Sequence, residues 1–126
     1  MTGRPAPLDP TSDGQPYVFV SVPALPVGVR PVATVEEPEG LTVVLPKAEA
    51  DRHGLAYGLV AARITLGLQS ELDVVGLTAA VSAALAASSI SCNVVAGAHH
   101  GHLFVPFDRA PEALGILRAL DPQIQR

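Results

Sequence analysis

The sequence predicts an α+β protein in which a strand–helix–strand–strand–helix unit occurs twice, forming antiparallel sheets with helices on one face. Three observations favour this fold. Short β-branched segments alternate along the chain with Ala- and Leu-rich segments of helical period. Two strands end in a proline that precedes an Ala/Glu-rich helix, at Pro46 and at Pro106. The chain has 126 residues, 48% of them apolar, which suffices for one core or for two small halves that share it.

The first half is expected at residues 17–61, after a disordered leader at residues 1–16 that is rich in proline and glycine. Residues 17–22 are β-branched or aromatic on both faces and predict a covered strand. Three prolines then reduce the first helix of this half to one turn at most. That turn is expected at residues 23–31. A hairpin at residues 32–45 and a short helix at residues 47–53 follow it.

The second half is expected at residues 62–126. Residues 63–68 alternate strictly, with Ile64, Leu66 and Leu68 on one face, and predict a half-buried strand. Asp108 is placed to cap the last helix, in which leucines form a buried stripe. The elements between are a helix and two strands, at residues 76–87, 90–96 and 102–106.

Composition excludes several classes of protein. Eight basic against 12 acidic residues give a net charge of -4 and no basic stripe for nucleic acid. Cys92 is the single cysteine, which is typical of a reducing cytoplasm. Residues 74–107 lack charged side chains, but serines and Asn93 interrupt them, so we expect a buried helix and strands there rather than a membrane span.

The second half resembles the signature of the ACT domain, a ferredoxin-like fold. The residues that carry the resemblance are Asp73-x-x-Gly76-Leu77 before an Ala-rich helix, and Ile90-x-x-Asn93 at the next strand. With the segments at 39–46 and 102–106, the chain is similar to small stand-alone bacterial proteins of tandem ACT-like halves, related to the cytosolic arginine sensor. The resemblance covers about residues 17–120. It implies a cytoplasmic regulatory module that binds an amino acid, without catalysis or cofactor, and forms a homodimer or larger homo-oligomer.

A ligand site is expected where the loop before residue 76 enters the helix. Free N–H groups at a helix start suit a carboxylate, and a glycine such as Gly76 allows close approach. Asp73 and Glu71 are acceptors for an ammonium group, while side chains on the following strand bond the carboxylate. Because the first half lacks this motif, we expect at most one site per pair of halves. The predicted site residues are Ser70, Glu71, Asp73, Val75, Gly76, Leu77, Ser91 and Asn93.

Two alternatives stay open at this point. The apolar strand at residues 17–22 is equally typical of a structural or protein-interaction module that keeps the architecture without a ligand. His100 and His102, two residues apart on a strand, form half of a metal site, which needs further ligands. Cys92 has only hydroxyl and amide neighbours in the sequence, so we interpret it as a core residue rather than a nucleophile.

Overall fold

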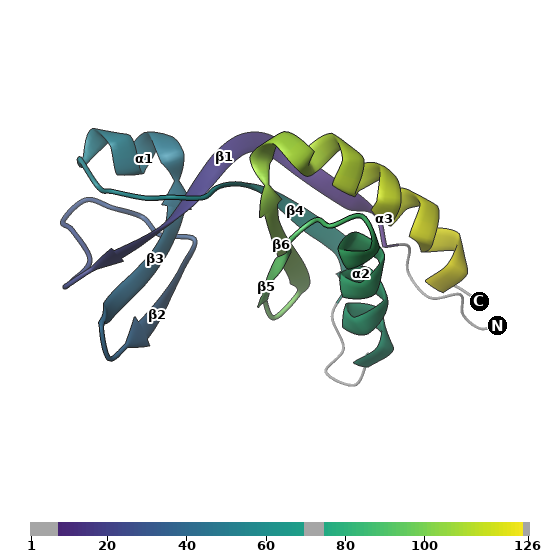
Figure 1. Ribbon diagram of the computed structural model, residues 1–126. Coiled ribbons are helices and arrows are strands. Elements are labelled where there is room, and N and C mark those ends of the chain that lie inside the picture. The colour runs from purple at the N-terminus through teal and green to yellow at the C-terminus, as the bar shows by residue number, and fades with distance from the viewer. Residues whose placement is uncertain (1–7, 70–74, 125–126) are drawn as a thin grey trace.

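A single antiparallel sheet organises the chain, with all helices on one of its faces (Figure 1). The computed structural model describes residues 8–69 and 75–124, and within them six strands lie in the order β2-β3-β1-β4-β6-β5. The strands are β1 (Pro10–Val22), β2 (Ala33–Glu37), β3 (Gly40–Pro46), β4 (Val60–Gln69), β5 (Asn93–Ala96) and β6 (His100–Pro106). The helices are α1 (Lys47–Arg52), α2 (Val75–Ala87) and α3 (Ala110–Ile124), with a 3-10 turn at Phe107–Arg109. The predicted α+β fold is confirmed.

The expected leader is wrong in its length. β1 begins at Pro10 rather than at Tyr17, and Leu8, only 1% exposed, belongs to the core under α2 and α3. The strand accommodates its prolines and glycine because its pairing with β4 shifts register between Ser12 and Pro16. The residues inside this bulge, 13–15, contain Gly14 with a φ of +77, a conformation that favours glycine.

Several boundaries also differ from the prediction. β4 begins at Val60, inside the expected loop, whereas β5 begins only at Asn93, because Ile90 leaves the sheet to fill the core. No side chain caps the turn that precedes α3, and Asp108 lies within that turn rather than at its start. In residues 23–31 the prolines leave turns and bends without a helix.

The face of the sheet that carries the helices contains two core clusters. Ile64 and Leu66 of β4 pack with Val81 and Leu85 of α2 and with Leu117 of α3. A smaller cluster lies beside α1 and is formed by Val18, Val20, Val29, Val43, Leu45 and Ala50. Alanines along α2 favour the helical conformation, and the helix packs chiefly against α3. No described helix has the length and hydropathy needed to cross a membrane.

The opposite face, called the open face below, carries the alternate residues of the same strands. Near its centre Phe104 of β6 is fully buried against the rings of Tyr17 and Phe19 of β1, at centroid distances of 5.9 and 5.5 Å. Both ring pairs are edge-to-face, the arrangement that aromatic quadrupoles favour. The contact joins β1 to β6 across β4.

Strands β1 to β3 and strands β4 to β6 have the same pairing. β1 pairs with β3 so that Tyr17 lies opposite Pro46, and β4 pairs with β6 so that Ala61 lies opposite Pro106. β2 and β5 form the two edges of the sheet. Pro46 is followed by α1, and Pro106 is followed by the 3-10 turn that precedes α3. The segment between β4 and β5 contains α2, whereas the segment between β1 and β2 has turns and bends.

We expect Leu8→Ala to lower the free energy of unfolding by about 2–5 kcal/mol, because it leaves a cavity in the core. Urea titration followed by circular dichroism measures this. Leu25→Ala is the control, since that leucine is 40% exposed and its loss costs little. Equal midpoints for the two variants would mean that the chain before β1 contributes nothing to the core.

Candidate functional site

The structure places the predicted site residues in three groups. Ser70, Glu71 and Asp73 lie outside the described residues, and α2 begins at Val75. Gly76 is exposed, and a Cβ added there would meet no atom within 4 Å, so space beside the helix start is open. Leu77 packs against the core under α2.

Ser91 and Asn93 form the third group, and the structure does not bring them to the start of α2. Asn93 begins β5 only six residues after the end of α2, opposite Phe104 and level with Arg63 in the middle of β4. α2 has 13 residues and is about 20 Å long at 1.5 Å per residue (Figure 1). The start of α2 therefore lies about that far from its C-terminal end, which leads to Asn93. The predicted pairing of the helix entrance with Asn93 is therefore not observed.

A different group of polar side chains meets on the open face, where β1 runs beside β4. The group, called the open-face cluster, consists of Thr11, Asp13, Arg63, Thr65 and His102. A polar hollow of about 200 Å³ lies here and is called the open-face hollow below. It is lined by Thr11, Ser12, Asp13, Arg63 and Thr65. Strand alternation places Arg63 and Thr65 here, because Ile64 and Leu66 point to the helices.

The bulge of β1 holds Asp13 in place. The backbone N–H of Gln15 donates to Asp13 Oδ1 at 3.0 Å, and the N–H of Gly14 donates to Ser12 Oγ at 3.2 Å. The hydroxyl of Tyr17 donates to the other oxygen of Asp13. Burial and this bond to Asp13 raise the pKa of Tyr17, so its hydroxyl stays protonated and keeps donating.

Arg63 is half-buried and has no carboxylate partner in the part of the chain that the structure describes. None of the ion pairs found among the described residues includes it, and its Nε is a buried donor without a hydrogen-bond acceptor. The guanidinium carbon lies 5.9 Å from the centroid of the Tyr17 ring, and Nη2 lies 3.4 Å from His102 Nδ1. Arg63 lines the hollow and pairs with no carboxylate of the described residues, so this guanidinium is suited to an external anion.

His102 completes the cluster from β6. Its Nδ1 lies 3.1 Å from the hydroxyl oxygen of Thr65. Burial lowers the pKa of His102, and the charge of Arg63 and the nearby His100 lower it further. The ring is therefore neutral near pH 7, and it leaves Arg63 as the main positive charge of the hollow.

The two histidines of the alternative metal site, His100 and His102, gain no further ligand among the described residues. His100 is exposed on β6, and within the described part of the chain no three His, Cys, Asp or Glu side chains are grouped to hold a metal ion. Cys92 is half-buried, and burial raises the pKa of its thiol, which disfavours the reactive thiolate.

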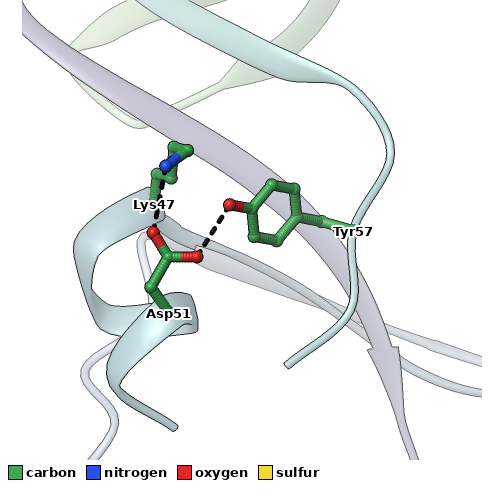
Figure 2. Close-up of polar contacts among 3 residues, drawn as sticks. All are labelled: Lys47, Asp51 and Tyr57. Atoms are coloured by element: carbon green, nitrogen blue, oxygen red, sulfur yellow. Dashed lines mark hydrogen bonds and ion pairs between the residues drawn. The ribbon is translucent and has the colours of Figure 1, made fainter. Parts of the chain in front are cut away.

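A second polar group lies on the other half, around α1 (Figure 2). Lys47 Nζ donates to Asp51 at 3.0 Å, and the hydroxyl of Tyr57 donates to the second oxygen of Asp51 at 2.7 Å. The Tyr57 bond first, and Lys47 second, lower the pKa of Asp51. These side chains link α1 to the segment that leads into β4, which is a structural role.

The fold is that of ACT regulatory domains. The ACT domain family matches residues 6–62, which include β1, the bulge and α1. This match lies on the first half, whereas the sequence resemblance was strongest in the second. The regulatory subunit of aspartate kinase from Thermus flavus has the same fold at 9% identity, with a TM-score of 0.60 over 93% of this chain and 98% of that chain.

A nearer relative places the chain in a family. The protein VC0802 from Vibrio cholerae, described as of unknown function and a possible transport protein, is 40% identical over 86% of this chain and 85% of its own, with a TM-score of 0.77. The chain therefore belongs to the same family as this Vibrio protein. Atu0741 from Agrobacterium tumefaciens is similar in fold, at 19% identity and a TM-score of 0.61 over 82% of this chain and 81% of that chain. None of the curated proteins compared with the chain matches it.

Acidification is expected to destabilise the protein through His102. Its pKa is lowered in the folded state, so the unfolded chain binds the proton first and stability falls as the pH drops below about 6.5. Urea midpoints at about pH 7.5 and about pH 5.5 should differ less in His102→Gln than in the wild type. His99→Gln, a change at an exposed histidine, should keep the wild-type difference. An undiminished difference in His102→Gln would contradict this assignment.

Proposed function

We propose that the protein is a regulatory module that binds an amino acid and catalyses no reaction. It consists of two ACT-like halves, acts in the cytoplasm and assembles as a homodimer or larger homo-oligomer. The observation that carries the proposal is the polar hollow between β1 and β4, where the half-buried Arg63 has no carboxylate partner among the described residues.

Two findings support parts of this proposal. The ACT domain match and the shared fold of the regulatory subunit of aspartate kinase support a ligand-binding regulatory module. The equivalent pairing of β1 with β3 and of β4 with β6 supports two related halves.

Amino acids are expected to stabilise the protein against heat. A ligand at 100 times its dissociation constant adds about 2.7 kcal/mol to the free energy of unfolding, which raises the melting temperature by several degrees. Differential scanning fluorimetry with each of the twenty amino acids, followed by calorimetric titration, measures this. If none of the twenty raises the melting temperature or gives heat of binding, the proposed function is wrong.

A protein-interaction module without ligand is the second candidate, favoured by the edges of the sheet. Val35 on β2 and Val94 on β5 are 55% and 42% exposed on the two edge strands. Edge strands expose unpaired backbone groups that a further chain can pair with.

We expect light scattering at micromolar concentration to give the mass of a dimer or larger assembly. Val94→Lys on β5 and, separately, Val35→Lys on β2 place a charge on each edge and identify the edge that associates. The exposed Val27→Lys, away from both edge strands, is the matched control. A monomeric wild type would count against association in both candidates.

A further inference from the structure

We propose that the open-face hollow binds one small, uncharged α-amino acid, with Arg63 holding its carboxylate and Asp13 its ammonium group. This inference rests on the proposed function and names the ligand class and the residues of the site. It places the site at the β1 bulge, away from the entrance of α2.

Arg63 is suited to a carboxylate by geometry as well as by charge. A guanidinium presents parallel N–H donors that match the two oxygens of a carboxylate. Arg63 lines the hollow and takes part in none of the ion pairs among the described residues, so its guanidinium is available to a carboxylate that enters there. The ring of Tyr17 and the Nδ1 atom of His102 beside the guanidinium restrict its movement, which reduces the ordering required when a ligand binds.

Asp13 is suited to an ammonium group. A carboxylate has about four acceptor positions, and Gln15 N–H and Tyr17 O–H occupy one on each oxygen, leaving the others for a ligand. The carboxylate is exposed and forms no ion pair within the described parts of the chain. Arg63 and Asp13 line the same hollow and carry opposite charges, as the two ends of a zwitterion do.

The remaining lining indicates the size and polarity of the side chain. Thr11, Ser12 and Thr65 contribute hydroxyl groups, and none of the described residues that line the hollow is large and apolar. A volume of about 200 Å³ holds a small amino acid, and a large apolar side chain would find little apolar surface to bury against. Glycine, alanine and serine are therefore the expected ligands.

Calorimetric titration of the full chain with these three amino acids tests the assignment. Arg63→Gln and Asp13→Asn are each expected to weaken binding by about tenfold or more, since each removes one charge-assisted contact. Arg118→Gln and Asp108→Asn remove the same charges at exposed positions of the chain and should leave the affinity unchanged. Ethylamine and propionate, which each lack one of the two charged groups, should bind at least tenfold more weakly than alanine.

A second measurement protects the test against variants that do not fold. Amide NMR spectra of the wild type, titrated with alanine, should show shifts at Asp13, Arg63 and Thr65 that exceed those at Gly76 and Asn93. Arg63→Lys keeps the charge without the planar fork and should bind alanine with an affinity between those of the wild type and Arg63→Gln.

The results separate this inference from the proposed function. If another class of amino acid binds, or if binding persists in Arg63→Gln and Asp13→Asn but weakens in Asn93→Ala, the inference is overturned and the proposed function stands. If none of the twenty amino acids binds, both fall. Binding of glycine, alanine or serine with the expected losses in both variants supports the assignment.

Discussion

The antiparallel pairing of β1 with β4 is the constraint on which the rest of the structure depends. Without this pairing the sheet would divide into two three-stranded sheets, β2-β3-β1 and β4-β6-β5, in which β1 and β4 would be edge strands. The pair turns both strands into interior strands, which satisfies their backbone groups and removes two edges. It also brings Tyr17 and Phe19 of β1 to Phe104 of β6, so that the open face has an aromatic core without a covering helix.

The same pairing is imperfect at one place, and that imperfection creates the polar hollow. The bulge places three residues, 13–15, opposite Arg63, where a regular ladder would place one. Bulges change the direction of side chains and often occur beside functional sites. Here the bulge lies beside a half-buried guanidinium that pairs with no carboxylate of residues 8–69 or 75–124.

Local patterns predicted the elements well where one period dominates. The alternation around Ile64, the Ala-rich residues of α2 and the two proline-ended strands all formed as expected. Residues 10–16 were missed because prolines and glycine are typical of loops, and a bulged interior strand is the exception that accepts them. Arg63 was visible as the charged residue of the face opposite Ile64 and Leu66, but nothing local distinguished it from a solvent-exposed arginine.

The sequence by itself determined the kinds of elements, their order and the α+β class, because helical and strand periods depend on neighbouring residues. Only the tertiary structure decided which polar residues meet. Thr11 and Thr65, 54 positions apart, are hydrogen-bonded across β1 and β4, whereas Asn93 lies far from the helix start that precedes it in the chain. The physical reason is that such long-range pairings are set by the free energy of burying the apolar faces of the whole sheet. Every strand contributes to that free energy, so no short segment of the sequence encodes the pairing.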